Sequence, residues 1–366
     1  MGRLNDLHDE FGQSPWLDNL KRGWITSGEL ARWVERGVRG LTSNPTIFAK
    51  AIADSPDYDA QFGDLVRGGT SVEESYWKLV TTDIEDALAI LRPVHDASDG
   101  VDGYVSVEVA PELARDTEAT YEAAKFLHAA IDEPNLFVKI PGTAEGIDAI
   151  RRSIAEGRSI NVTLLFGLGR YGDVIEAYIA GLEELVAGGG DPRPVASVAS
   201  FFVSRVDTLV DRRLEEIGTD EALALRGRAA IANAQLAYEL FLERFRGDRW
   251  DALAAKGARV QRPLWASTST KNPAFPDTMY VDELIGPDTV NTMPDGTLEA
   301  FEDHGALART VDADLDGARA TVARLQELGI DLEEVAATLE EEGVASFSKS
   351  FDELLAALGA KAADLA

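Results

Sequence analysis

The stretch YVSVEVAPELARDTEATYEAAKFLHAAIDEPNLFVKI, residues 104–140, decides the fold. It begins with a short apolar run at 104–109 and ends with a second at 135–140, both typical of buried strands. Between them, at 112–131, apolar residues recur three and four positions apart, which is the spacing of an amphipathic helix. A strand, a helix and a second strand in this order predict two parallel strands joined by a helical crossover.

The same unit recurs along the whole chain. Further helical spacings occupy 71–94, 171–187 and 221–245, and a helical tail is expected at 331–358. Additional apolar runs complete a set of eight expected strands: 14–20, 39–44, 159–166, 194–200, 262–267 and 288–293. Eight such units in one uninterrupted chain favour a (β/α)8 TIM barrel over a doubly wound sheet. A barrel usually needs ~250 residues, so we expect residues 1–366 to form a single barrel domain with extra N-terminal and C-terminal helical segments.

Composition narrows the possible functions. Hydrophobic residues make up 45% and charged residues 27% of the 366, as in ordinary soluble proteins. There is no cysteine for a disulfide, a thiolate metal site or a cysteine nucleophile. The 35 Lys and Arg residues stand against 64 Asp and Glu, and this net charge of −29 repels nucleic acids and anionic membranes. An anionic substrate must therefore find a local basic pocket.

Neither a membrane segment nor a secretion signal is expected. No run approaches ~18 consecutive apolar residues, and the opening MGRLNDLHDEFGQ (1–13) lacks an apolar signal core. We therefore expect a cytoplasmic protein whose partners are neither membranes nor nucleic acids. The sequence leaves open whether the chain is a monomer or a homodimer.

Polar residues gather near the carboxyl ends of the expected strands. Side chains alternate along a strand, so residues two positions apart share a face. One face of each strand carries the following pairs: Trp16/Asp18, Thr42/Asn44, Ser106/Glu108, Phe137/Lys139, Asn161/Thr163, Val198/Ser200, Trp265/Ser267 and Asn291/Met293. In a (β/α)8 barrel the active site forms at the carboxyl ends of the strands. We therefore expect these faces to point into the barrel and their polar ends to converge on one site.

Three ionisable residues in this set indicate chemistry. Lys139 lies in the apolar run LFVKIPG (136–142), where burial disfavours an ammonium group and favours the neutral amine that can attack a carbonyl. The alternative is a lysine at the strand edge whose amine reaches solvent. Glu108 is equally unusual in its apolar run, and the alternative is a buried ion pair with an arginine. Asp18 precedes Asn19, so its alternative is an ordinary turn residue.

Other motifs carry less information. GLGRYG (167–172) follows an expected strand and matches the dinucleotide-binding pattern G-x-G-x-x-G. The acidic residue required about 20 positions later would be Asp191, which falls in a turn, so we interpret the glycines as easing a strand-to-helix turn. The four histidines lack the spacing of metal ligands: His8, His95, His128 and His304. No metal site is expected.

Several motifs together resemble the transaldolase family, and in particular its longer bacterial subgroup. They occur in order along the chain: LTSNPTIF (41–48), VSVEVAPELARD (105–116), FVKIPGT (137–143), INVTLLF (160–166), ASFFVSRVD (199–207) and WASTSTKNP (265–273). The segment EEEGVASFSKSFDELL (340–355) also resembles the closing helix of that family. The resemblance implies a class I aldolase-type barrel that works through a lysine Schiff base, with neither a metal nor a cofactor.

The resemblance also implies an activity and the residues that perform it. The family transfers a dihydroxyacetone unit from sedoheptulose 7-phosphate to glyceraldehyde 3-phosphate, which gives erythrose 4-phosphate and fructose 6-phosphate in the pentose phosphate pathway. Lys139 then forms the Schiff base, and Glu108 is the acid and base of that step through a water held with Thr163. Asp18 takes the proton of the C4 hydroxyl during carbon–carbon cleavage.

Residues that bind the sugar follow from the same resemblance. Asn44, Asn161 and Ser200 match positions that hydrogen-bond the dihydroxyacetone unit. The family also contains fructose-6-phosphate aldolases, which release free dihydroxyacetone and carry Gln where Glu108 stands and Tyr where Phe202 stands. Glu and Phe at these positions favour transfer, and a Schiff-base aldolase of that type is the alternative function.

The phosphate site departs from the family pattern in one respect. Arg205 matches the phosphate-binding arginine, and its alternative role is an ion pair with Asp207 or with a helix carboxylate. The shorter form of the family has Ser-x-Arg where this chain has Ser267 followed by Ser269. Either Ser269 or the nearby Lys271 therefore completes the expected phosphate site.

Overall fold

Eight parallel strands close into a barrel in the computed structural model, which describes residues 2–53 and 55–365. The strands are β1 (Gln13–Leu17), β2 (Leu41–Thr42), β3 (Val105–Glu108), β4 (Leu136–Pro141), β5 (Ile160–Leu165), β6 (Ser197–Phe202), β7 (Arg262–Ala266) and β8 (Thr289–Met293). Each strand pairs with the next, and β8 returns to pair with β1 along its whole length. The predicted (β/α)8 barrel is confirmed.

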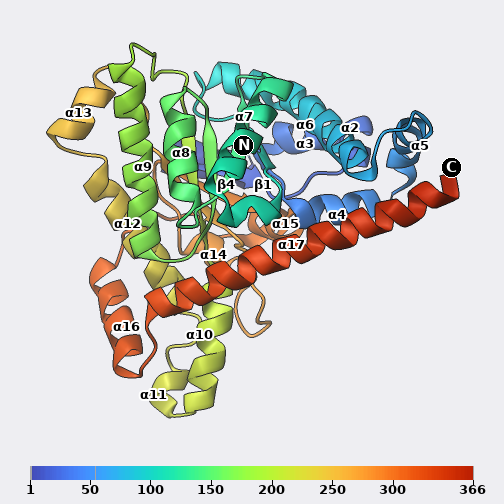
Figure 1. Cartoon of the computed structure of the whole chain (residues 1–366). Helices are drawn as coiled ribbons and strands as arrows, with labels where there is room; N and C mark the ends of the chain where they lie inside the picture. The colour runs from blue at the N-terminus through green and yellow to red at the C-terminus, as the bar shows by residue number, and fades with distance from the viewer. Residues whose placement is uncertain (1, 54, 366) are drawn as a thin grey trace.

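Helices connect the strands and surround them (Figure 1). The first part of the chain forms α1 (Arg3–Phe11), α2 (Arg22–Thr26), α3 (Glu29–Arg36), α4 (Pro45–Ala53), the 3-10 turn η1 (Pro56–Tyr58), α5 (Asp59–Arg67) and α6 (Val72–Ala97). The middle part forms η2 (Pro111–Arg115), α7 (Thr117–Ile131), α8 (Gly146–Ala155), α9 (Leu168–Ala187), α10 (Ser204–Ile217), α11 (Asp220–Leu223), α12 (Ala229–Arg244) and α13 (Asp248–Ala254). The last part forms α14 (Met279–Asp282), α15 (Asp295–His304), α16 (Leu315–Glu327) and α17 (Leu332–Leu365).

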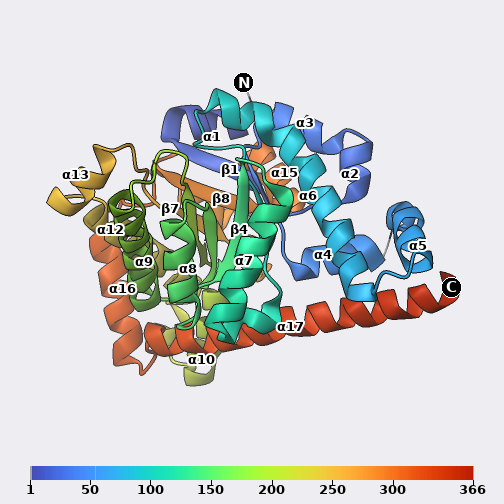
Figure 2. The same cartoon turned by 45° about the horizontal axis from the view of Figure 1, so that its top comes forward.

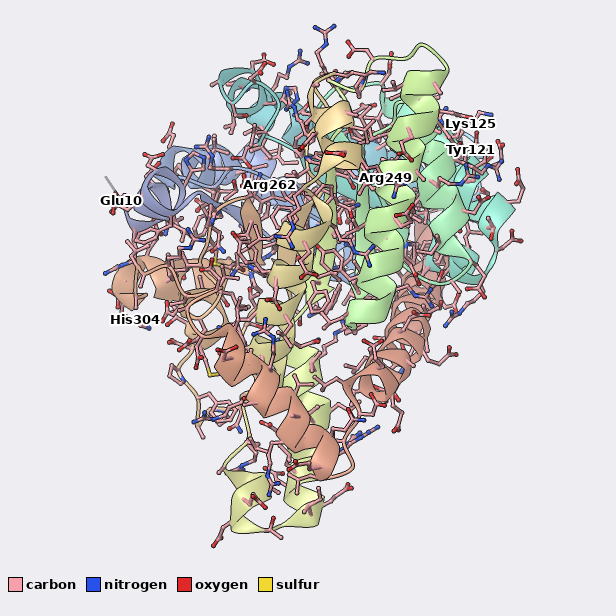
Figure 3. The ribbon with its side chains drawn as sticks, turned by 90° about the vertical axis from the view of Figure 1, so that its left-hand side faces the viewer. Glu10, Tyr121, Lys125, Arg249, Arg262 and His304 are labelled. Carbon is pink, nitrogen blue, oxygen red and sulfur yellow. The ribbon has the colours of Figure 1, made fainter. Side chains whose placement is uncertain are left out.

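Charged side chains join neighbouring helices of the outer layer. Arg249, on α13, faces α9 (Figure 3), where its guanidinium lies 2.7 Å from Glu176 Oε1 and 2.8 Å from Glu183 Oε1. Exposed pairs of this kind contribute little each, because water solvates the separated charges well.

One expected helix, at 221–245, is divided in the structure into α11 and α12. The break includes Gly227, whose backbone has a left-handed φ of 71° and whose N–H donates to Asp211 Oδ1 at 2.9 Å. A residue with a left-handed backbone conformation ends the hydrogen-bond pattern of a helix. The spacing of apolar residues does not reveal such a break. The expected helix at 112–131 likewise begins late, as α7, because Asp116 acts as its N-cap.

Side chains point into the barrel as expected on β1 to β6. Asn161 Nδ2 on β5 donates to Ser106 Oγ on β3 at 3.0 Å. Since β4 lies between these two strands, the bond crosses the barrel interior. Ser200 on β6 joins the same group by donating to Asn161 Oδ1 at 2.7 Å. Three strands are thus linked inside the barrel by one polar chain.

The expected inward faces of β7 and β8 are wrong. Trp265 on β7 packs its ring against Phe201, which in turn packs against Tyr171 of the surrounding helix α9, so Trp265 points outward. On β8 Thr292 faces the interior, and its Oγ1 lies 2.6 Å from Thr42 Oγ1 across β1. On β8 the polar residues Asn291 and Thr292 are adjacent, so they lie on opposite faces of the strand. Polarity therefore did not indicate which face points into the barrel. On β7 the expectation rested on Ser267, which lies just beyond the end of the strand at Ala266.

A buried ion-pair network fills the amino-terminal end of the barrel. The fully buried carboxylate of Asp102 lies 3.1 Å from Arg262 Nη1 and 2.8 Å from Arg39 Nε, and it accepts a hydrogen bond from Ser14 at 2.9 Å. Burial opposes ionisation, but the two guanidinium groups and the hydroxyl hold the pKa of Asp102 below its ordinary value. The network belongs to the end of the barrel opposite the strands' carboxyl ends.

The expected helical tail is one long helix, α17, which runs across the carboxyl end of the barrel (Figure 1, Figure 2). Near its start, Glu333 Oε1 accepts a hydrogen bond of 3.1 Å from the Gly169 N–H at the N-terminus of α9. A Cβ atom on Gly167 would lie 2.8 Å from Ala336 Cβ. The glycines of GLGRYG therefore let α17 approach, and a carboxylate of the protein itself occupies the helix N-terminus where a dinucleotide would place its phosphates.

Candidate active site

Nearly all the expected site residues meet in one pocket at the carboxyl end of the barrel. The space between its side chains, part of it open to solvent, measures about 550 Å³. It is lined by Asp18, Thr42, Asn44, Lys139, Thr163, Ser200, Phe202, Arg205, Ala266, Ser267, Ser269, Lys271, Thr292, Pro294 and Phe347. The two remaining expected residues, Glu108 and Asn161, lie directly behind this wall, in contact with Lys139 and Ser200. The structure thus brings together every residue of the expected set.

Lys139 lies near the carboxyl end of β4 and is only 4% exposed. Its Nζ is 3.0 Å from Glu108 Oε2 and donates to the carbonyl oxygen of Ser43 at 3.1 Å. The alternative in which the amine reaches bulk solvent is therefore wrong. The buried partner of Glu108 is this lysine rather than an arginine, because Glu108 and Lys139 are opposite each other in the register of β3 and β4.

Burial changes the acidity of both carboxyl groups beside the lysine. It raises the pKa of Glu108, and the positive charge of Lys139 opposes that rise. Burial also raises the pKa of Asp18, against the charge of Lys139 and a hydrogen bond of 2.7 Å from Thr42 Oγ1. Asp18 is therefore not a solvated turn residue. A carboxyl group that holds its proton more tightly than usual is suited to general acid and base catalysis near neutral pH.

A bulge in β5 presents the Thr163 hydroxyl to the pocket. The register with β6 shifts between Val162 and Leu165, and Leu164 has a left-handed φ of 60°. Thr163 Oγ1 is buried and has no hydrogen-bond partner within the described ranges. A buried hydroxyl without a partner is costly unless a bound molecule satisfies it, which suits a residue that holds a water or a substrate oxygen.

Two amide side chains have fixed orientations. Asn161 donates to Ser106 and accepts from Ser200, so its amide is held from both sides within the barrel. Asn44 Oδ1 accepts from the Ile47 N–H at 2.9 Å, which leaves its Nδ2 available to the pocket. Groups held in this way can recognise hydroxyl groups without first reorganising.

Two cations stand at the mouth of the pocket. Neither Arg205 nor Lys271 has a carboxylate within 4.0 Å in the part of the chain that the structure describes; Lys271 Nζ instead donates to Ser269 Oγ at 2.5 Å. Asp207, the alternative partner of Arg205, accepts from Tyr280 and from the Ala230 N–H, each at 2.8 Å. This arrangement is the local basic pocket that an anionic substrate of so acidic a protein requires.

Ser267 reaches the pocket by an irregular route. It follows the end of β7 with a left-handed φ of 57°, and its Oγ lies 2.9 Å from Ser204 Oγ at the start of α10. Phe347 also lines the pocket but comes from the distant helix α17. Sequence reasoning missed Phe347, because an apolar residue on an amphipathic helix looks like any other core residue.

Comparison with known proteins agrees with this geometry. A family model described as transaldolase/fructose-6-phosphate aldolase matches residues 15–358. The chain belongs to the transaldolase/fructose-6-phosphate aldolase family. The match includes most of β1, all of β2 to β8 and most of α17. The barrel and the helix that crosses it therefore both belong to the part of the chain that matches the family.

Individual relatives in this family are similar over nearly their full length. A protein of Parafrankia sp. (strain EAN1pec) named Transaldolase is 54% identical over 354 residues, which is 96% of each chain. Another Transaldolase, of Thermobifida fusca (strain YX), is 52% identical over 354 residues, again 96% of each chain. Transaldolase 1 of Streptomyces avermitilis is 52% identical over 357 residues, 97% of this chain and 94% of the relative.

Two further findings concern the described residues as a whole. No group of three or more His, Asp or Glu side chains in them is arranged to hold a metal ion. None of their helices is long and apolar enough to cross a membrane.

Proposed function

We propose that this chain is a transaldolase that moves a dihydroxyacetone unit from sedoheptulose 7-phosphate to glyceraldehyde 3-phosphate. The observation that carries the proposal is the buried pair of Lys139 and Glu108, with 3.0 Å between Nζ and Oε2, at the base of a pocket whose mouth holds Arg205 and Lys271. The name Transaldolase of relatives that are more than half identical supports the same activity.

Imine formation is the first step. Lys139 first passes a proton to Glu108, 3.0 Å away, and its amine then attacks the C2 carbonyl of the ketose phosphate, which gives a carbinolamine. Loss of the C2 oxygen as water requires a proton, and Glu108 supplies it through a water held with Thr163. The raised pKa of Glu108 suits this role, because the carboxyl group must hold a proton and then release it.

Carbon–carbon cleavage follows from the imine. Asp18 takes the proton from the C4 hydroxyl, the C3–C4 bond breaks, and its electron pair moves into the protonated imine to give an enamine on Lys139. The aldose phosphate leaves with its new carbonyl group at the former C4. The acceptor aldehyde then enters, the enamine carbon attacks its carbonyl carbon, and Asp18 returns the proton. Water releases the new ketose phosphate from Lys139.

The remaining pocket residues bind the sugar. Asn44, Asn161 and Ser200 hydrogen-bond the hydroxyl groups of the dihydroxyacetone unit, and Phe202 forms an apolar wall beside it. Arg205, Lys271 and Ser267 hold the phosphate. Lys271 supplies the second positive charge, and Ser269 fixes the lysine by the hydrogen bond described above.

The same chemistry would also fit an aldolase that releases free dihydroxyacetone. Glu108 and Phe202 favour transfer, since the aldolases carry Gln and Tyr at these positions, and the names of the relatives agree with transfer. We further propose that the protein acts in the cytoplasm on sugar phosphates of the pentose phosphate pathway.

Acceptor dependence tests the proposal. Purified protein is incubated with fructose 6-phosphate, with and without erythrose 4-phosphate. A transaldolase forms sedoheptulose 7-phosphate and turns over only when the acceptor is present. Sustained release of dihydroxyacetone without an acceptor would identify an aldolase, and no turnover with either mixture would refute both functions.

A further inference from the structure

One face of α17 touches the carboxyl end of the barrel at positions three or four residues apart. A Cβ atom on Gly343 would lie 2.9 Å from Leu164 Cδ2 and 3.7 Å from Arg205 Nη1. Phe347, one turn further along, lines the substrate pocket. Phe351 then packs against Tyr76 of α6, with 5.4 Å between ring centroids. The helix therefore forms one wall of the pocket.

Two aromatic rings hold the guanidinium of Arg205. Its Cζ atom lies 5.2 Å from the ring centroid of Phe202, on β6, and 5.7 Å from that of Phe347, on α17. Both rings are buried, at 7% and 4% exposure. A cation over the face of an aromatic ring is attracted by the negative potential of that face. The two phenylalanines thus fix a guanidinium that forms no ion pair within the described ranges.

This way of holding an arginine leaves its hydrogen-bond donors free. A carboxylate partner would occupy them and would repel an incoming anion, whereas an aromatic face does neither. Carboxylates lie further away and attract the guanidinium, namely Asp18 in the pocket, Glu108 behind its wall and Glu342 on α17. Without the ring of Phe347, the arginine would be free to turn toward one of them.

We propose that Phe347 is a positioning residue for the phosphate group of the substrate, acting through Arg205. This proposal rests on the proposed function, because it assumes that the anion bound by Arg205 is the phosphate group of a sugar phosphate. It makes α17 the element that sets the preference for phosphorylated over unphosphorylated acceptors. Gly343 lets the helix approach closely enough for the contact, because any larger residue would meet Leu164.

The test compares Phe347→Leu, which removes the ring but keeps the apolar volume, with Phe347→Tyr, which keeps the ring. The matched control is Phe351→Leu, which removes an aromatic ring from the same face of α17 outside the substrate pocket. Affinity for inorganic phosphate is measured by calorimetry and as competitive inhibition against fructose 6-phosphate. Turnover with glyceraldehyde 3-phosphate and with unphosphorylated glyceraldehyde is measured in parallel.

We expect Phe347→Leu to weaken phosphate binding about five- to thirtyfold and to raise KM for glyceraldehyde 3-phosphate by a similar factor. With fructose 6-phosphate as a saturating donor, KM for unphosphorylated glyceraldehyde should change much less, and Phe347→Tyr and Phe351→Leu should bind phosphate like the parent protein. In an Arg205→Met background, Phe347→Leu should have no further effect. Should Phe347→Leu fail to fold, Phe347→Met gives the same comparison.

Three results would overturn the proposal. They are unchanged phosphate affinity in Phe347→Leu, an equal loss in Phe351→Leu, and an additional loss in the Arg205→Met background. The calorimetric measurement does not depend on turnover. If the protein proved not to be a transaldolase, phosphate binding would still report whether Phe347 positions Arg205.

Discussion

Glu108 Oε2 and Lys139 Nζ lie 3.0 Å apart on neighbouring strands, and both side chains are almost fully buried. Removing either partner leaves a charge that has lost both water and its counter-ion, which typically destabilises a protein by about 3–5 kcal/mol. A buried ion pair adds little stability compared with apolar residues in the same place. Its presence in the core of a barrel is therefore explained better by chemistry than by folding.

The lysine that forms the imine can be identified directly. With fructose 6-phosphate and borohydride, we expect a stable dihydroxyacetone adduct on the peptide that contains Lys139, detected by mass spectrometry. Lys139→Ala should lose both the adduct and turnover. Lys125→Ala is the control, because Lys125 lies on the outer surface on α7 (Figure 3), 3.7 Å from Glu122. An adduct on Lys125 or Lys271 would refute the assignment.

The two carboxyl groups should fail at different steps. Asp18→Ala should still form the imine but not break the C3–C4 bond, so borohydride should trap an adduct that retains the whole sugar. Glu108→Gln should slow imine formation and hydrolysis, which rapid-quench kinetics of adduct formation can measure. We expect both variants to lose about 100-fold or more in kcat. Accumulation of the same trapped species in both would contradict the separate roles.

The partly buried carboxyl group of Asp18 should make the protein less stable as the pH rises. Since its pKa is raised in the folded state, folding favours the protonated form, and this contribution is lost as the pH rises through the raised value. We expect Asp18→Asn, which can still accept from Thr42, to raise Tm by about 1–3 °C at pH 8. The difference should shrink toward pH 4. A lower Tm for Asp18→Asn at pH 8 would contradict this.

Asp102 should show the opposite pH dependence. Its pKa is lowered in the folded state, so its contribution to stability is present above the ordinary carboxyl pKa and is lost as the pH falls through the lowered value. Asp102→Asn leaves the buried guanidinium of Arg262 and the partly buried guanidinium of Arg39 without a counter-ion, and it should lower the free energy of unfolding by about 3–5 kcal/mol at pH 7. Urea unfolding of Asp64→Asn, at a 79% exposed surface position, is the control. Equal stability of both variants would refute the structural role of the network.

Chelation tests whether the imine alone stabilises the carbanion. A protonated imine accepts the electron pair of the broken bond, so a metal ion is not needed for that purpose. We expect full activity after exhaustive dialysis against EDTA. Loss of activity that zinc restores would instead indicate a metal-dependent aldolase mechanism.

The strands were predictable because parallel strands covered on both sides are short apolar runs. Even β2, with only Leu41 and Thr42 in the ladder, fell within the expected run at 39–44. The expected run at 194–200 is displaced, since β6 begins at Ser197 and continues to Phe202. Apolar residues flank both ends of that strand, so composition does not mark where its hydrogen bonds begin.

The site was predictable where a charge interrupts an apolar run, as Lys139 and Glu108 do. It was not predictable where backbone geometry or a distant helix determines it. The left-handed φ of Ser267 breaks the alternation on which the inward face of β7 was inferred. Phe347 reaches Arg205 only because α17 crosses the barrel, and no local pattern reports that contact.

The position of α17 in the chain has a consequence for biosynthesis. A ribosome delivers all eight strands, and with them Lys139, Glu108 and Asp18, before it delivers the helix that completes the pocket. A chain interrupted before Phe347 therefore contains the reactive amine but lacks the wall against which Arg205 is held. We expect such a chain to bind sugar phosphates more weakly than the chain of 366 residues, because Arg205 then keeps only the ring of Phe202 beside it.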